Sequence, residues 1–339
     1  MIVETLKREQ QQLMDKYSRF FGNIDFMPYG PKDESPSKQL FCRVFNRNID
    51  DQFWNWYYKI NPNGDPIIYI AKHEGAIVGY YALIPMKYSF KGAAHRLALS
   101  LHTMVDPLYE GKGIFLILEN LALQAACEKG IEAVIGFPNN KAYKGLVKRL
   151  HWLDIMNVPT LILELKNHKK SDLLGQGLVV KKIMEFDQGY DDLWNEHKGG
   201  NKWMPVKDVA YLNWRYFKSN RQYTVYSVSD SKDQLKGFMA YKLIKINNIL
   251  SLDLLDWFPG ISCVQMQYLL SKVIEENIHS VDVISTWCNN QAENNILQEC
   301  GFKESSFSTH FCLKILKSGS LEYAEAENWS ISMGMSDVY

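Results

Sequence analysis

A repeat constrains the fold of this chain most strongly: four short motifs occur twice, in the same order, about 150 residues apart. The matching stretches are 53–58 with 211–216, 79–86 with 237–244, 134–140 with 283–290, and 150–152 with 300–302. A fixed period of this kind is typical of repeated structural units. Chance readily supplies one such match but not four in order, so we predict an internal duplication.

Hydrophobic periodicity and turn residues predict the elements of the first copy. We expect a helix over 4–18, a loop over 22–37, a helix over 49–58, and strands over 67–71, 77–90 and 94–105. A helix over 113–129, a strand over 133–137, a helix over 139–150 and a strand over 155–165 follow. The polar stretch 166–178 ends in a glycine-rich turn and predicts a linker. The expected fold is α/β: two modules, 1–165 and 179–339, each a mixed central sheet flanked by helices.

The composition excludes several classes of protein. With 46% hydrophobic and 22% charged residues, the chain is expected to be globular. Basic and acidic residues balance at 38 each, which gives no electrostatic support for a nucleic-acid or membrane partner. The amino-terminal residues lack a signal pattern, so we expect a cytoplasmic protein. The six cysteines contain no C-x-x-C pair, and we expect no metal site or disulfide framework.

The stretch 103–115 carries the chemistry that the sequence suggests most clearly. An apolar run ends there, Gly111 and Gly113 follow, and a long amphipathic segment begins. Glycines permit close backbone approach and positive φ, and the first N–H groups of a helix suit phosphate oxygens, so the stretch reads as a pyrophosphate-binding loop. An ordinary strand–turn–helix connection is the alternative. At the equivalent place, 255–262, the second copy has one glycine after a proline and lacks the Gly-Lys-Gly element.

With these motifs in view, the chain resembles the GNAT superfamily of acyl-CoA-dependent N-acyltransferases, as two tandem modules. The family signature is a strand ending near Val-x-Pro, then Gln/Arg-x-x-Gly-x-Gly/Ala at a helix start. Residues 105–107 and 110–115 match the strand and its central Gly113, whereas Glu110 and Phe115 depart from the signature. Residues 139–142, 290–292 and 301–302 resemble a second family element.

The resemblance implies acyl-CoA as co-substrate, with backbone N–H donors of 111–115 on its phosphates and no metal. It also implies that the strand before the loop pairs with the pantetheine arm. The implied cofactor-binding residues are Met104, Val105, Glu110, Gly111, Lys112, Gly113, Ile114, Phe115 and Asn139. Helix capping is an equally plausible role for Asn139. The usual general-acid tyrosine of the family falls at Val147 and Leu297, so another residue must fill that role or it is vacant.

N-acylation needs a neutral amine, and two side chains are our catalytic candidates. His102 precedes the loop and titrates near neutral pH, although a hydrogen-bonded structural histidine is the alternative. Tyr143 is a candidate proton donor to the leaving thiolate, with a packing role as alternative, and the same holds for Tyr109. Asp106, before Pro107, is expected to fix a turn.

In the second copy, Arg215 can grip a pyrophosphate bidentately and Trp214 can stack on a sugar or base, although aromatic residues at helical spacing are more often core. We expect both to bind substrate. The tandem organisation resembles nucleotide-sugar N-acyltransferases of bacterial surface-polysaccharide (O-antigen) biosynthesis. It implies transfer to the amino group of a nucleotide-linked amino sugar, for example a dTDP-3-amino-3,6-dideoxyhexose.

Two rival functions remain at this stage. Aminoacyl-tRNA-dependent peptidyl transferases of cell-wall synthesis also carry tandem GNAT folds, but they usually have a long helical hairpin that is not visible here. The other rival is a non-enzymatic binding protein in which both GNAT copies have degenerated. Glu110 and the missing tyrosine support it. We expect a monomer, because the tandem modules would form an internal pseudo-dimer.

Overall fold

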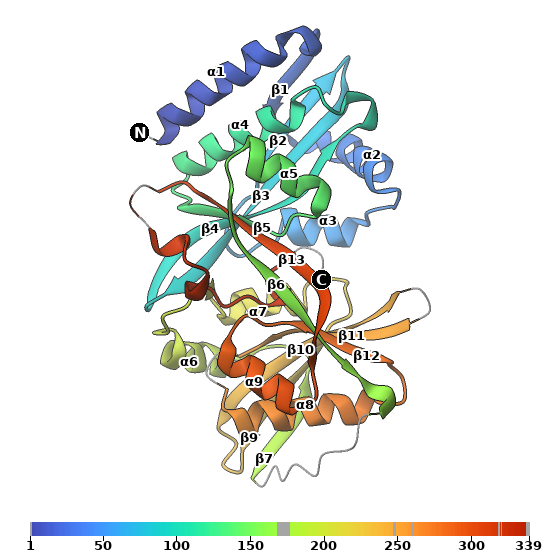
Figure 1. The fold of residues 1–339 in the computed structure, drawn as a ribbon, viewed down its shortest axis with the longest axis vertical. Coiled ribbons are helices and arrows are strands. Elements are labelled where there is room, and N and C mark those ends of the chain that lie inside the picture. Colours follow the sequence, from blue (N-terminus) through green and yellow to red (C-terminus); the bar gives the residue numbers. More distant parts are fainter. Residues whose placement is uncertain are drawn as a thin grey trace. The chain divides into compact units, whose positions relative to one another are not determined.

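A computed structural model describes residues 2–167, 177–246, 249–258, 261–317, 319 and 321–336 (Figure 1). The chain forms two compact units. Unit 1 comprises Met1–Lys87, His95–Ile155 and Cys312–Ala324, and unit 2 comprises Tyr88–Ala94, Met156–Phe311 and Glu325–Tyr339. Most of the predicted linker, residues 168–176, lies outside the described residues, so the predicted boundary stays a prediction.

Unit 1 begins with a long helix and then alternates strands and helices. Its helices are α1 (Ile2–Phe21), α2 (Glu34–Phe45), α3 (Asp51–Tyr58), α4 (Ile114–Glu128) and α5 (Asn140–Arg149), with short 3-10 turns at η1 (Pro31–Asp33) and η2 (Pro107–Tyr109). Its strands are β1 (Ile24–Pro28), β2 (Ile67–His73), most of β3 (Ala76–Phe90) and β4 (Ala93–Val105), and β5 (Ala133–Gly136). The apolar face of α4, including Leu118 and Ala122, packs on Ala98 and Val134 of the sheet.

Unit 2 has its own sheet and helices. Its helices are α6 (Gln188–His197), α7 (Val209–Tyr216), α8 (Cys263–Asn277) and α9 (Gln291–Glu299), and its strands are β7 (Leu178–Ile183), β8 (Met204–Pro205), β9 (Thr224–Asp230), β10 (Leu235–Ile246), β11 (Ile249–Trp257) and β12 (Val283–Trp287). Met266, Leu270 and Val273 of α8 pack on Leu252 and Ile284. Short 3-10 turns η4 (Leu321–Tyr323), η5 (Ala326–Asn328) and η6 (Met333–Met335) end the described chain, and η3 (Leu165–Asn167) follows β6.

The order of elements confirms the predicted fold of two tandem modules. β1, α2, α3, β2, β3, β4, α4, β5, α5 and then β6 (Leu153–Glu164) correspond one to one with β7, α6, α7, β9, β10, β11, α8, β12, α9 and then β13 (Lys303–Ile315). The strand pairing repeats as well. β4 pairs parallel with β5, and β11 pairs parallel with β12.

The last strand of each copy is exchanged. β13, from the second copy, pairs antiparallel with β5 over Cys312–Gly136 to Ile315–Ala133. β6, from the first copy, pairs antiparallel with β12 over Val283–Glu164 to Trp287–Thr160. Each unit therefore contains part of a strand from the other half of the sequence: Cys312–Ile315 of β13 in unit 1, and Met156–Glu164 of β6 in unit 2.

One predicted element is wrong. Residues 22–37, expected to form a loop, contain β1, η1 and the start of α2. β1 pairs antiparallel with β2 from Ile24–His73 to Pro28–Tyr69, with its proline at the strand end. Pro31 and Pro36 each lie in the first turn of a helix, where a missing N–H costs little. The prolines therefore mark the edges of elements and do not interrupt them.

Candidate active site

The strand that leads to the loop separates from its neighbour before it ends. β4 and β5 pair only over Leu97–Ala133 to Leu99–Ile135, and β5 ends one residue later, at Gly136. β4 continues to Val105. The predicted pantetheine residues, Met104, which is fully buried, and Val105, which is half-buried, therefore lie beyond the paired stretch.

His102 lies in the part of β4 that extends beyond its pairing with β5, and it has a left-handed backbone, with φ of 50°. In a regular strand, residues two apart share one face of the sheet. Ser100 lies near Tyr81, which packs with α4, since the hydroxyl oxygens of Ser100 and Tyr81 are 2.9 Å apart. His102 instead contacts Phe41 of α2 and Tyr58 of α3. The left-handed residue breaks the alternation, and backbone outliers of this kind cluster at functional sites.

An aromatic cluster surrounds the imidazole of His102, which is 7% exposed. The rings of Phe53 and Tyr57 lie 5.7 and 5.6 Å from it. The Tyr58 hydroxyl lies 2.6 Å from Nδ1, a distance that fixes the ring orientation. Sequence reasoning gave Tyr58 a core role, with ring stacking on a substrate as the alternative, and did not connect it to His102. The catalytic role of His102 stays a prediction.

Asp106 fixes the turn between β4 and the loop, as predicted. Its Oδ1 accepts a hydrogen bond from Leu108 N, and its Oδ2 accepts one from Arg43 Nε at 2.9 Å. Its own N–H donates to Val78 O. The loop is thereby held at its first residue by β3 and α2.

The loop leaves the amino end of α4 without a side-chain cap. Gly111 and Gly113 have φ of 76° and 80°, and Gly113 is the N-cap residue. The first N–H groups of a helix have no partner within the helix, and the helix dipole favours an anion near them. This geometry suits the phosphate oxygens that the sequence analysis assigned to this place.

Tyr17 of α1 covers Gly113. A Cβ at Gly113 would lie 2.5 Å from the Tyr17 ring, closer than any real contact. The residue must therefore be glycine for two reasons, its positive φ and the ring above it. The packing of α1 on the loop was not visible in the sequence.

The remaining predicted loop residues lie at the start of α4. Ile114 is buried, and Phe115 is half-buried against Gly145 of α5, where a Cβ would be 3.3 Å from its ring. The ammonium of Lys112 lies 4.4 Å from the centre of the Tyr109 ring. The Tyr109 hydroxyl is 2.8 Å from His73 Nδ1.

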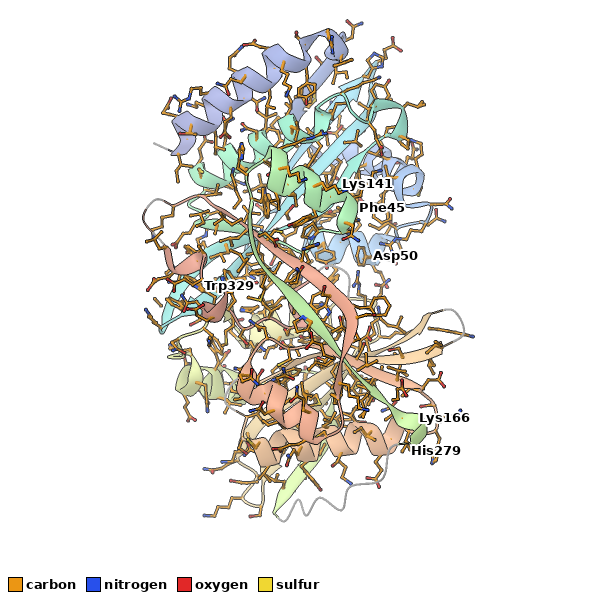
Figure 2. The ribbon with its side chains drawn as sticks, viewed as in Figure 1. Phe45, Asp50, Lys141, Lys166, His279 and Trp329 are labelled. Carbon is orange, nitrogen blue, oxygen red and sulfur yellow. The ribbon has the colours of Figure 1, made fainter. Side chains whose placement is uncertain are left out.

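Glu110 forms an ion pair with Lys141 of α5 at 2.8 Å; Lys141 is labelled in Figure 2. Both side chains are well exposed. The pair balances the acidic residue that departs from the family signature, so the loop does not present an isolated negative charge to a phosphate.

The other two predicted residues on this side come from α5 and the residue before it. Asn139 caps α5, since its Oδ1 accepts hydrogen bonds from Lys141 N and Ala142 N. The Tyr143 hydroxyl donates to Asp154 Oδ2 at 2.6 Å, and this hydrogen bond raises the pKa of Tyr143. Capping by Asn139 is thus observed. Its contact with the cofactor, and the catalytic role of Tyr143, stay predictions.

Trp214 and Arg215 lie on α7 of unit 2, and both are buried. The Arg215 guanidinium donates to Gly334 O through Nε and to the Tyr223 hydroxyl through Nη1. The chain itself therefore uses these donors. A substrate-binding role for the two residues stays a prediction.

Glu119 is a buried acid that sequence reasoning missed. It is 0% exposed in α4, and burial raises its pKa to about 8. Its Oε1 accepts a hydrogen bond from Trp152 Nε1, and its Oε2 has no partner among the described residues. One signal was available: it is the only acid between Ile114 and Ala126, within an otherwise mostly apolar stretch.

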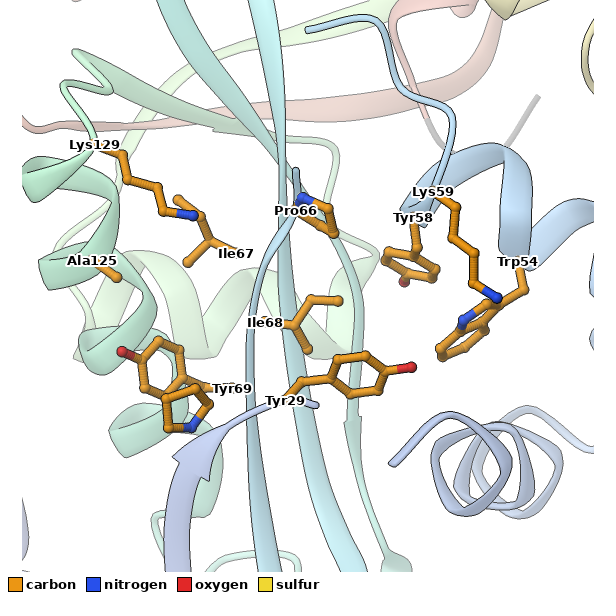
Figure 3. Close-up of a pocket in the computed structure, with 11 residues that line it drawn as sticks. Tyr29, Trp54, Tyr58, Lys59, Pro66, Ile67, Ile68, Tyr69, Ala125 and Lys129 are labelled. Carbon is orange, nitrogen blue, oxygen red and sulfur yellow. The ribbon is translucent and has the colours of Figure 1, made fainter. Parts of the chain in front are cut away.

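A separate pocket of about 330 Å³ lies at the other end of α4. Figure 3 shows Tyr69 and Lys129 on one side of β2, with Trp54, Tyr58 and Lys59 on the other. Because it meets α4 at Ala125 and not at the loop, it does not mark the phosphate site.

No described helix combines the length and apolar content needed to cross a bilayer. Within the described ranges, no three His, Cys, Asp or Glu side chains are arranged to hold a metal ion.

A family model matches the part of the chain that forms most of unit 1. Residues 26–149, from β1 to α5, match the acetyltransferase (GNAT) domain. No curated protein matches the chain.

Several solved structures are similar in fold. A GCN5-related N-acetyltransferase from Anabaena variabilis has a TM-score of 0.69 at 14% identity, over 89% of this chain and 75% of its own. A probable N-acyltransferase from Enterococcus faecalis has a TM-score of 0.68 at 10% identity, over 87% and 73%. A tandem GNAT protein from the clavulanic acid biosynthesis pathway has a TM-score of 0.57 at 12% identity, over 88% of this chain and 100% of its own.

Proposed function

We propose that the chain, which matches a GNAT domain model over residues 26–149, is an acyl-CoA-dependent N-acyltransferase and acylates the amino group of a nucleotide-linked amino sugar. A dTDP-3-amino-3,6-dideoxyhexose is an example of such an acceptor. We propose the cytoplasm as the compartment, since nucleotide-linked sugars and acyl-CoA would both be at hand there.

The observation that carries the donor half of the proposal is the uncapped amino end of α4, next to the point where β4 leaves β5. The N–H groups of residues 111–115 would hold the pyrophosphate. The pantetheine arm would lie along Met104 and Val105, which orients the thioester. The acceptor half rests on the tandem organisation and its resemblance to nucleotide-sugar acyltransferases.

The reaction would be direct transfer. The amine nitrogen attacks the thioester carbonyl carbon, the C–S bond breaks, and the thiolate of CoA leaves. His102 would take the proton that the amine loses, directly or through water, with its ring held by Tyr58 at Nδ1. Tyr143 would return a proton to the thiolate. Its hydroxyl is oriented by the hydrogen bond to Asp154.

The acyl group is proposed to be larger than acetyl. Met104 and Phe115 are apolar side chains beside the predicted path of the thioester. An apolar surface there gains free energy from each methylene group that it covers, about 0.8 kcal/mol.

A product screen tests the whole proposal. Nucleotide-linked amino sugars are incubated with acetyl-CoA and with longer acyl-CoAs, and products are identified by mass. We expect a mass increase equal to one acyl group, with the longer donors turned over faster. Turnover of other amines but of no amino sugar would refute the acceptor class, and a strong preference for acetyl-CoA would refute the acyl length.

A binding measurement separates the donor from the acceptor. Calorimetry with acyl-CoA in the absence of acceptor should show saturable binding. Absence of binding would refute the loop assignment, whatever the acceptor screen gives.

A further inference from the structure

The described chain ends in a segment, residues 329–336, with a regular burial pattern. Every second residue is apolar and almost fully buried: Trp329, Ile331, Met333 and Met335 are 1 to 3% exposed. Ser330 and Ser332 lie between the first of them and are half-buried, whereas Gly334 and Ser336 are buried as well. Trp329 and Ser332 have extended backbones, and the 3-10 turn η6 (Met333–Met335) follows. Alternate apolar anchors separated by small residues, as at 329–332, are typical of an extended peptide held in a groove. We call residues 329–336 the C-terminal segment (Trp329 is labelled in Figure 2).

The C-terminal segment is bound at one side by Asn289, which lies just beyond β12. Asn289 Oδ1 accepts a hydrogen bond from Ile331 N at 2.8 Å, and its Nδ2 donates to Trp329 O at 2.8 Å. A single side-chain amide thus satisfies both the donor and the acceptor of an extended backbone, as a neighbouring strand would.

At its other side the segment lies against β11 and α7. A Cβ at Gly334 would be 2.7 Å from the Tyr216 hydroxyl and 3.2 Å from Leu255 O. The Gly334 carbonyl accepts a hydrogen bond from Arg215 Nε at 2.8 Å. No larger residue fits at Gly334 unless its neighbours shift.

These contacts place the segment between the ends of two strands that have separated. β11 and β12 pair only from Ser251–Val283 to Leu254–Thr286, and Leu255 and Asn289 both lie beyond that stretch. The equivalent place in unit 1 is where β4 leaves β5, next to the α4 loop.

We propose that unit 2 retains the cleft between β11 and β12 as a peptide-binding site, whose ligand is the C-terminal segment of the same chain. The cleft is therefore closed to a pantetheine arm, and the chain binds one acyl-CoA. This goes beyond the proposed function, because it holds whatever the acceptor in the reaction is.

Cleavage of the folded chain tests the proposal. A protease recognition sequence is inserted between Ala324 and Glu325, and the full chain is folded before it is cut. We expect the released peptide to stay bound through gel filtration. Its exchange with a labelled synthetic peptide of residues 325–339 gives the dissociation rate.

Two variants and one control identify the contacts. Asn289→Ala removes two hydrogen bonds, and at about 1 kcal/mol each the peptide should dissociate about thirtyfold faster. Gly334→Ala should speed dissociation to a similar extent, through the overlap with Tyr216. Gly199→Ala is the control, because a Cβ there meets open space within the same unit.

The proposal is overturned if the peptide leaves the cut wild-type protein at once, or if both variants release it at the wild-type rate. Hydrogen exchange on the uncut chain gives a second readout that needs no cleavage. The Ile331 amide should be protected, and Asn289→Ala should remove that protection. Exchange of the wild-type Ile331 amide at the rate of the free peptide, or calorimetric binding of two acyl-CoA per chain, would also refute the proposal.

Discussion

The amino ends of α4 and α8 occupy equivalent places in the two copies. They differ in whether a side chain accepts hydrogen bonds from their first N–H groups. At α8, Ser262 caps the helix and Gln265 returns the hydrogen bond, which forms a complete capping box. At α4, Gly113 caps the helix and no side chain contributes. The second copy has closed its helix end with its own side chains, whereas the first leaves that end for another acceptor.

This difference separates scaffold from function. Both copies keep the helix, its apolar face and the parallel strand pair beside it, which are needed for folding. Capping by serine stabilises a protein by about 1 kcal/mol, so an uncapped helix is a cost that a ligand can offset. The unequal helix ends therefore support the proposal that unit 1 binds the donor.

The largest effect is expected at Gly113. Gly113→Ala places a side chain at positive φ and against the Tyr17 ring, and together these should cost about 4 kcal/mol. We expect acyl-CoA affinity, measured by calorimetry, to fall at least a hundredfold.

Gly111→Ala is the matched control, since Gly111 also has a positive φ but has no atom within 4 Å of an added Cβ. Its affinity for acyl-CoA should fall tenfold or less. Tyr17→Ala combined with Gly113→Ala should recover part of the loss. Equal losses in the two glycine variants would show that α1 does not matter to the loop.

The next effect concerns the pH dependence of stability. The folded chain keeps a proton on Glu119 up to about pH 8, whereas the unfolded chain releases it near its ordinary value of 4.5. The free energy of unfolding therefore falls between these two values, by about 1.4 kcal/mol per pH unit. At the equivalent helix position, unit 2 has Tyr268.

Glu119→Gln keeps the acceptor for Trp152 and removes the titration. Relative to wild type it should gain about 3 kcal/mol of stability between pH 4.5 and pH 7. Denaturant unfolding at several pH values measures the slope, which separates this effect from any constant packing change. Identical slopes in the two proteins would contradict the buried protonated acid.

A smaller effect is expected when the α8 cap is opened. Ser262→Ala should lower the free energy of unfolding by about 1 kcal/mol, measured by denaturant titration. It should not create a second acyl-CoA site, because the C-terminal segment still fills the cleft next to α8. Binding of two acyl-CoA per chain by this variant would contradict the proposed difference between the two copies.

The smallest effect is expected at the exposed Glu110–Lys141 pair. Lys141→Ala leaves the charge of Glu110 uncompensated beside the proposed phosphates, so affinity for acyl-CoA should fall two- to threefold, about 0.5 kcal/mol. Glu110→Gln should raise affinity by a similar factor. Both changes should shrink at high salt, and a salt-independent loss would show that Lys141 acts by contact.

Much of the fold could be predicted from the sequence because it is local. The glycine stretch placed the start of α4 within one residue, and the repeated motifs gave the order of elements in both copies. The Asp106 turn followed from its position before Pro107. Periodicity, turn residues and a repeat are all visible within short windows.

What the sequence did not show depends on distant contacts. Three contacts were missed: Tyr17 over Gly113, Trp152 on the buried Glu119, and Tyr58 on His102. In each, the two residues are 33 or more positions apart in the sequence. The loop predicted over 22–37 failed because prolines at the ends of elements resemble prolines within loops. No short window distinguishes the two.

The exchanged last strands govern when unit 1 can fold. Its sheet is completed by Cys312–Ala324, which the ribosome makes long after Ile155. At 5 to 20 residues per second, the first unit would wait about ten to thirty seconds for its final strand during synthesis. Throughout that interval the edge of β5 that faces away from β4 lacks its partner β13, which exposes the nascent chain to wrong pairing. A fragment ending near residue 165 would stay in that unfinished condition permanently.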